Sequence, residues 1–294
     1  MDDYEYDDAE PEAYLPEKRK RAPDSGRKSG PVRWWLYGCG CLFLCCACWT
    51  LPVLALGVGG VTLAAILDNS KVTASGSETV ALDPDQPVSL DVTNHAGKVV
   101  IQAGDPDEIV VDYTKTAYAF SRGAASDQLN QIAVAVAQRD DGTVAVTVDQ
   151  QGSSTFFFQG DTVDLTITVP PELALRVTHE AGKVEIGGVR VTALDVNNNA
   201  GDVVFDGALV GSGPFALSLD VGDMTVRLPP DTFVDLDAQT EVGEVSVSGF
   251  EAADSSTGGD GIGATWRGTL GAGEGTPPVF TLRLNVGEIA VQRR

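Results

Sequence analysis

The sequence predicts an all-β fold, a parallel β-solenoid-like stack of repeats of about 20 residues, placed behind one transmembrane helix. Three observations lead to this prediction. A short motif recurs six times, its apolar residues alternate with polar ones, and one long run near the N-terminus lacks charged residues. A β-sandwich of hairpins with similar strand lengths is the alternative fold. The solenoid is favoured because the motif keeps its phase over four successive copies.

The recurring motif centres on a glycine. It reads EAGKVEI at 180–186 and NAGDVVF at 199–205, for example. The glycines of the six copies are 85, 19, 21, 21 and 44 residues apart, so the longer intervals are close to multiples of the shorter ones. These repeat glycines are Gly97, Gly182, Gly201, Gly222, Gly243 and Gly287.

Four positions around each repeat glycine are apolar in all six copies: seven and five residues before it, and two and four residues after it. The residues between them are mostly polar. Alternation with a period of two on both sides of a turn is typical of two strands that each bury one face. The glycine is expected where the turn needs a positive φ or a close approach of the neighbouring backbone. Each repeat should therefore bury its apolar face on the next.

The long interval between the first two repeat glycines predicts further strands over 109–116, 132–139, 143–149 and 162–169. The residues RDDGT at 139–143 predict a hairpin turn between the second and third of these strands. The residues ASDQLNQ at 125–131 predict one helical turn with Ser126 or Asp127 as its cap. The segment SSTGGDGIGATWRG at 255–268 predicts an exposed loop before the last repeat.

The run from Trp34 to Leu67 contains no Asp, Glu, Lys or Arg. As a helix it is long enough to cross the roughly 30 Å hydrocarbon core of a bilayer. Seven Lys or Arg residues lie between Lys18 and Arg33, whereas Lys71 is the only one just after the run. The positive-inside rule then predicts a single-pass protein of the cytoplasmic membrane, with the N-terminus inside and the C-terminal domain outside.

Four segments are therefore expected along the chain. They are a disordered cytoplasmic tail at 1–33, the transmembrane helix at 34–67, a linker at 68–79 and an extracytoplasmic β-repeat domain at 80–294. All five cysteines lie within the apolar run, between Cys39 and Cys48. Their position predicts packing in the membrane rather than a metal site, and it leaves the β-domain without a disulfide.

The net charge of the chain is -22, and residues 68–294 hold 33 acidic against 13 basic residues. Nucleic-acid binding is excluded as a function because it needs a basic face. Acidic residues directly follow four of the repeat glycines, and in a stack with strands about 4.8 Å apart they would form a row of like charges. We hypothesise that this row binds divalent cations such as calcium, or a basic partner; no other cofactor is expected. These candidate metal ligands are Asp202, Asp223, Glu244 and Glu288.

No catalytic set can be assembled from the sequence, so an enzyme is not expected. The two histidines, His95 and His179, fall near repeat glycines and are expected as solvated turn residues. The serines lack the context of a nucleophile elbow. The residues GDGIGA at 259–264 fit a loose dinucleotide-binding pattern, but no strand-then-helix unit surrounds them.

The segment VDLTITVPPELALRVTHEAGKVEI at 163–186, followed by recurrent G-x-V-x-V motifs behind one membrane helix, resembles the bacterial putative-adhesin β-repeat domain family of unknown function. The resemblance covers Val80 to Arg294. It implies a parallel β-solenoid-like domain outside the cytoplasmic membrane. No shared catalytic residues come with it, so it transfers no site to this chain.

Two functions fit these observations. The first is a membrane-anchored extracytoplasmic module with an adhesin-like binding or scaffold role in the cell envelope. Its partner would be an envelope polymer or protein, with membrane lipid around residues 34–67. The alternative is a sensor of envelope stress or of a ligand, which signals to a cytoplasmic partner through the tail.

Overall fold

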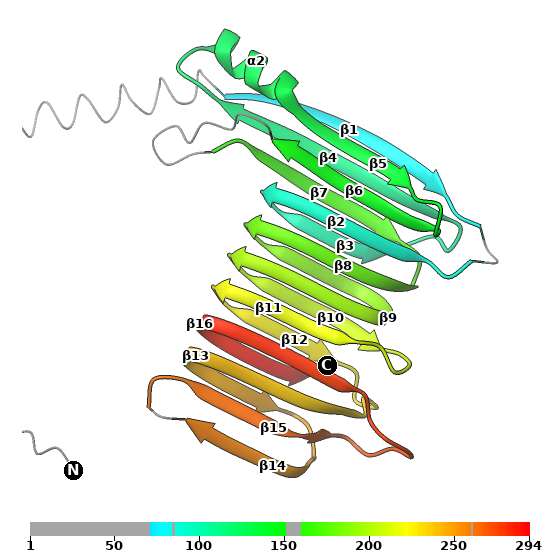
Figure 1. Ribbon diagram of the computed structural model, residues 1–294, viewed down its shortest axis with the longest axis vertical. Coiled ribbons are helices and arrows are strands. Elements are labelled where there is room, and N and C mark those ends of the chain that lie inside the picture. Colours follow the sequence, from blue (N-terminus) through cyan, green and yellow to red (C-terminus); the bar gives the residue numbers. More distant parts are fainter. Residues whose placement is uncertain (1–70, 84–85, 151–159, 260) are drawn as a thin grey trace, which may run out of the picture. The chain divides into compact units, whose positions relative to one another are not determined.

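The computed structural model describes residues 71–83, 86–150, 160–259 and 261–294. These residues belong to one compact unit (Figure 1). Within them, no helix is long and apolar enough to cross a membrane. The predicted cytoplasmic tail and the predicted transmembrane helix at 34–67 lie outside the described residues.

The described residues form sixteen strands and one helix, which confirms the all-β prediction. The first half contains β1 (Lys71–Ala81), β2 (Ser89–Ala96), β3 (Val99–Ala103), β4 (Glu108–Tyr118), α2 (Arg122–Gln131), β5 (Ile132–Gln138), β6 (Thr143–Gln150) and β7 (Thr162–Val169). The second half contains β8 (Glu172–Ala181), β9 (Val184–Ala200), β10 (Val203–Leu209), β11 (Phe215–Val221), β12 (Met224–Leu228), β13 (Val234–Ser248), β14 (Ala252–Gly259), β15 (Ala264–Leu270) and β16 (Val279–Arg293).

The six repeats pair with one another in parallel, in two layers (Figure 1). The strand before each glycine lies in one layer, which we name the first layer, and the strand after it lies in the second. Equivalent positions face each other: Leu90 pairs with Leu175, and Leu175 pairs with Leu194. The strands β9, β13 and β16 each contribute to both layers.

The order of the repeats in space differs from their order in the sequence. The repeat of Gly97 lies directly beside that of Gly182, although the chain between them forms β4 to β7. The strand β16, which carries Gly287, pairs with β12 on one side and with β13 on the other. The last repeat is thus inserted between those of Gly222 and Gly243.

The core lies between the two layers and consists of the apolar positions that the motif defines. Of these 24 side chains, only Val245 and Val247 are partly rather than fully buried. The rings of Phe205 and Phe280 meet edge to face, with centroids 6.3 Å apart. Burying such side chains stabilises the fold by about 1.5–3 kcal/mol each, so the repeated pattern itself supplies the core.

Antiparallel strands lie beside the first and last parallel strands. The strands β4 and β1 continue from β7, and β5 continues from β6. All four strands expected between the first two repeat glycines are present, as is the hairpin turn at 139–143.

The helix α2 is longer than the single turn expected. Its N-cap is Ser121, whose hydroxyl accepts the N–H of Ala124, and not Ser126 or Asp127.

The exposed loop expected at 255–268 is wrong. The strands β14 and β15 form an antiparallel hairpin there, and β15 pairs along β13. Trp266 and Leu270 of β15 are buried, so tertiary packing of two large side chains overrides a glycine- and serine-rich composition.

Residues 71–79, which the sequence assigned to a linker, belong to β1. This strand pairs with β4 over eleven residues.

Candidate functional site

The six repeat glycines form one row along a turn of the stack. All have φ between 125° and 140°, a conformation that residues with a side chain rarely adopt. A Cβ atom on Gly201 would overlap the carbonyl oxygen of Gly182, and one on Gly222 would overlap that of Gly201. Glycine is thus required by the backbone conformation and also by the close approach of the next strand.

The four candidate metal ligands do lie in one row beside these glycines. Their order in space is Asp202, Asp223, Glu288 and Glu244, because β16 is inserted before β13. Glu244 and Glu288 are directly paired across the two strands. The four acids are therefore neighbours in the strand register, and their role as metal ligands stays a prediction.

Backbone N–H groups satisfy part of this acidic row. Asp223 Oδ1 accepts the N–H of Glu288 at 3.2 Å, and Asp202 Oδ1 lies 3.5 Å from the N–H of Asp223. Such charge-assisted bonds offset part of the repulsion between the carboxylates of the row. No group of three or more His, Cys, Asp or Glu side chains in the described ranges has the geometry to hold a metal ion.

Basic residues occupy the same row in the first two repeats. Lys98 and Lys183 both contact Glu185, each with an Nζ–carboxylate distance of 2.6 Å. Hydrogen bonds from Lys183 and then Lys98 lower the pKa of Glu185 below its ordinary value. The row therefore changes from two ion-paired lysines to four acidic residues.

An inner row of polar side chains lies three residues before four of the six repeat glycines; Leu219 and Leu284 occupy the other two places. Asn94, His179, Asn198 and Thr240 are all at most 3% exposed. Asn198 donates to the carbonyl oxygen of Gly182 at 3.1 Å, and Asn94 donates to that of Val163 at 3.0 Å. These side chains thus bond to carbonyl groups at the turn of a neighbouring strand.

His179 belongs to this inner row, so its expectation as a solvated turn residue is wrong. Its Nδ1 lies 3.0 Å from the carbonyl oxygen of Asn94 and its Nε2 lies 2.9 Å from that of Gly97. Burial lowers the pKa of His179, and the two carbonyl contacts partly oppose this shift. His95 is half-exposed, as expected, and its Nδ1 lies 3.0 Å from Glu180.

A signal for the inner row was present in the sequence. Residues seven, five and three before each glycine have the same parity on a strand and so point to the same side. Because the first two positions are apolar and buried, the third must also face inward. Strand parity therefore predicts a buried His179, whereas residue type alone favours an exposed one.

Arginines and aspartates form a second row, which the sequence reasoning missed, on the outer face of the first layer. Arg139 donates to Asp91 at 2.9 Å. Arg176 donates to Asp195 through both Nε and Nη2, at 3.1 and 3.0 Å. These pairs come from residues six positions before a repeat glycine, or from the neighbouring hairpin.

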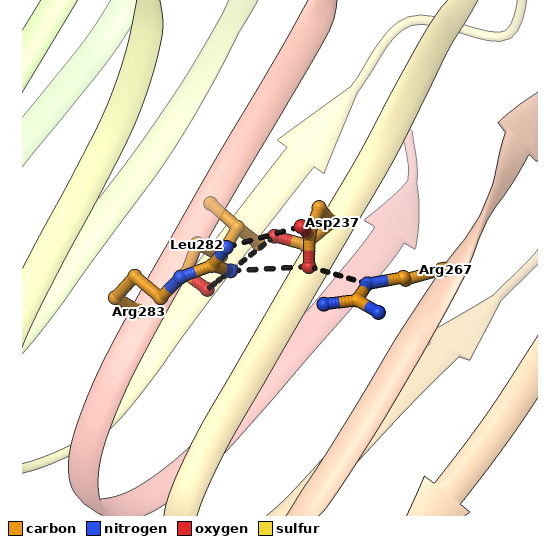
Figure 2. Close-up of polar contacts among 4 residues, drawn as sticks. All are labelled: Asp237, Arg267, Leu282 and Arg283. Carbon is orange, nitrogen blue, oxygen red and sulfur yellow. Dashed lines mark hydrogen bonds and ion pairs between the residues drawn. The ribbon is translucent and has the colours of Figure 1, made fainter.

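The same face carries a three-residue ion network nearer β14. Figure 2 shows the guanidinium groups of Arg283 and Arg267 on either side of the Asp237 carboxylate. Arg283 donates to Asp237 Oδ1 and Oδ2 at 3.1 and 3.0 Å, and Arg267 Nε donates to Oδ1 at 3.2 Å. Hydrogen bonds from Arg283 are the main cause that lowers the pKa of Asp237; burial opposes them, and Arg267 adds to them.

Two shallow hollows follow this outer face. One has a volume of about 300 Å³ and is lined by the Arg139–Asp91 and Arg176–Asp195 pairs. The other has a volume of about 270 Å³ and is lined by Asp235, Asp237 and Arg267. Small residues also line the hollows, Ala174 and Ala193 in the first and Gly268 in the second.

The sequence matches no family model and no curated protein. The structure is similar to that of a putative cell adhesion protein from Clostridium sporogenes. The TM-score is 0.54 at 14% identity, over 75% of this chain and 100% of that one. At this identity, the likeness shows a common fold and nothing about a shared activity.

Two further solved structures align over similar lengths. A putative adhesin from Bacteroides fragilis has 11% identity and a TM-score of 0.25, with 74% of this chain and 97% of that one covered. A putative adhesin from Parabacteroides distasonis has 10% identity and a TM-score of 0.23 over the same shares. These scores are too low to support an argument.

Proposed function

We propose that this chain is a membrane-anchored binding module of the cell envelope, whose β-solenoid-like domain presents an ordered polar surface outside the cytoplasmic membrane. The observation that carries the proposal is the outer face of the first layer. There, in-register parallel strands align charged and polar side chains in rows. Extended surfaces of this kind suit contact with long or repeating partners.

The anchoring part of the proposal rests on the sequence. The uncharged run from Trp34 to Leu67 provides the span, and the basic residues before it set the orientation. The binding part is in keeping with the fold, which this chain shares with a putative cell adhesion protein. We propose an adhesin-like binding or scaffold role rather than catalysis, with an envelope polymer or protein as partner.

Anchoring can be tested by cell fractionation. The full-length chain is expected to remain with membranes after an alkaline carbonate wash, and a variant lacking residues 34–67 is expected to move to the soluble fraction. Protease added to intact spheroplasts should degrade the β-domain and spare the N-terminal tail. A tail that is cut while the β-domain survives would reverse the proposed orientation.

Binding can be tested with the full-length chain reconstituted in nanodiscs. Retention on cell-envelope fractions and on whole cells of the producing organism is measured against empty nanodiscs, at low and high salt. Saturable retention on either material supports the binding module. Absence of retention at every salt concentration contradicts it.

A further inference from the structure

The outer face of the first layer carries a continuous row that crosses seven strands. Each member pairs with the next in the strand register. We name this row the outer ladder; its residues are Asp91, Arg176, Asp195, Ala216, Thr281, Asp237 and Arg267. At about 4.8 Å per strand, the row is roughly 30 Å long. The two hollows lie along its two ends.

A second polar row runs beside the outer ladder, two residues further along each strand. Its members are also paired strand by strand. They are Thr93, Thr178, Asn197, Ser218, Arg283 and Gln239. Every strand from β2 to β13 along this face therefore offers hydroxyl, amide, guanidinium or carboxylate groups, which together both donate and accept hydrogen bonds.

The outer ladder, the second row and the two hollows have a different charge balance from the domain as a whole. Four arginines (Arg139, Arg176, Arg267, Arg283) and four aspartates (Asp91, Asp195, Asp235, Asp237) lie in these two rows and the hollows, so their formal charges cancel. Residues 68–294 as a whole carry 33 acids and 13 bases. A neutral ligand gains most from such a balanced surface, because neither an anion nor a cation finds a net opposite charge there.

The side chains also retain hydrogen-bonding capacity after they pair. Arg176 uses Nε and Nη2 for Asp195 and is 63% exposed, and Nη1 takes no part in this ion pair. Arg267 uses Nε for Asp237 and is 60% exposed. The ion pairs hold each guanidinium plane in place, so a ligand meets fixed donors and loses little side-chain entropy on binding.

We propose that the outer ladder binds a neutral, hydroxyl-rich glycan chain that lies across the strands. Sugar hydroxyls both donate and accept, which matches the mixed rows of the ladder. An extended peptide would need a strand edge or apolar pockets, and nucleic acid would need a basic face. This inference rests on the proposed binding function and names the class of its partner.

The test uses the full-length chain in nanodiscs and four neutral hexasaccharides as probes: cellohexaose, chitohexaose, maltohexaose and mannohexaose. Calorimetric titration is expected to give saturable binding of at least one of them, with a dissociation constant below about 1 mM. The matching disaccharide should bind at least tenfold more weakly, because it spans only a fraction of the ladder. Hexalysine and a polyglutamate hexamer serve as charged probes.

Two variants locate the binding surface. Arg176→Ala removes a ladder arginine that is 63% exposed and paired with Asp195. Arg190→Ala is the matched control, because Arg190 is 59% exposed, is also ion-paired, with Glu172, and lies off the ladder. Hexasaccharide affinity is expected to fall at least tenfold in the first variant and to stay within twofold in the second, with equal melting temperatures.

The outcomes separate this inference from the proposed function. If the chain is retained by cells or envelope fractions but binds none of the hexasaccharides, the glycan assignment is overturned and the binding module stands. Equal loss of affinity in both variants also overturns it, as does tighter binding of either charged probe. If nothing retains the chain, both proposals fail.

Discussion

The Nε2 atom of His179 lies 2.9 Å from the carbonyl oxygen of Gly97, a residue 82 positions earlier in the chain. Because Nδ1 also faces a carbonyl oxygen, a neutral ring can donate to only one of its two contacts. The ring thus joins two adjacent repeats at a buried point of the turn. Its protonation state is therefore coupled to the stability of the stack.

The stability of the domain is expected to decrease as the pH falls below 6.5, the ordinary value for histidine. Since the pKa of His179 is lowered in the folded protein, the unfolded chain binds the proton first. The free energy of unfolding therefore drops between pH 6.5 and the folded pKa, then levels off. Urea unfolding across this pH range measures the effect.

His179→Asn should remove this pH dependence at a cost of about 1 kcal/mol at pH 7. Asparagine is the natural choice because Asn198 already donates to a glycine carbonyl from the equivalent position. His95→Asn is the control and should leave the pH dependence intact. If the His179→Asn protein keeps the full pH dependence, His179 is not its source.

Substitution of glycines by alanine should give three distinct levels of destabilisation. Gly222→Ala should cost at least about 3 kcal/mol, because it combines a φ of 139° with overlap of a backbone oxygen. Gly142→Ala has a φ of 83° and open space, so it should cost about 1 kcal/mol. Gly187→Ala has neither problem and should stay within about 0.5 kcal/mol. Equal costs at Gly222 and Gly142 would show that close approach contributes nothing.

Asp237→Asn should lower the free energy of unfolding by about 1–2 kcal/mol at pH 7, because two arginines lose their shared carboxylate. The folded pKa of Asp237 is lowered, so its contribution is present above the ordinary value of 3.8 and is lost as the pH falls through the folded pKa. The difference between wild type and variant should therefore shrink below pH 3.8. Asp112→Asn, at an exposed position on β4, is expected to change stability by less than about 0.5 kcal/mol at either pH.

Asp223→Ala should destabilise the domain by about 1 kcal/mol, whereas Asp223→Asn should have little effect. The reason is the bond from the Glu288 N–H to Asp223 Oδ1, which an amide oxygen can also accept. Thermal melting of both variants tests this role of the acidic row. Equal melting temperatures for the alanine and asparagine variants would mean that the bond does not contribute.

The motif predicted the all-β class and the core because both follow from local parity. Residues such as Leu90 and Val92 alternate with polar neighbours, and a strand that buries one face requires this alternation. The need for glycine at Gly97 or Gly222 is equally local, since φ is a property of one residue. These features can be read from single repeats.

The order of the strands could not be predicted in the same way. All six repeats have compatible apolar faces, so periodicity does not specify which repeat pairs with which. The insertion of β16 between β12 and β13 depends on the path of the connecting hairpin β14–β15. The sequence instead suggested a loop there, because glycines and serines dominate its composition.

The candidate site was predicted only where its members shared one place in the motif. Asp223 and Glu288 both follow a repeat glycine. Because equivalent positions of stacked repeats pair with each other, these two residues become neighbours. Arg176 and Asp195 also share a place, six residues before a repeat glycine. Because their charges are opposite, the sequence pattern did not indicate that they form a row. Arg267 and Arg139 lie outside the motif. Only the strand register places Arg267 on the ladder, and only the bond to Asp91 places Arg139 beside it.

The insertion of β16 also has a consequence for how the domain is made. When β13 has been synthesised, its final neighbour β16 has not yet been made, so neither β12 nor β13 has its partner on that side. Assembly cannot proceed as a simple zipper from the first strand to the last. The stack is completed only when β16 has been added. A truncated chain without β16 would expose the unpaired edges of β12 and β13 to aggregation and to quality-control proteases.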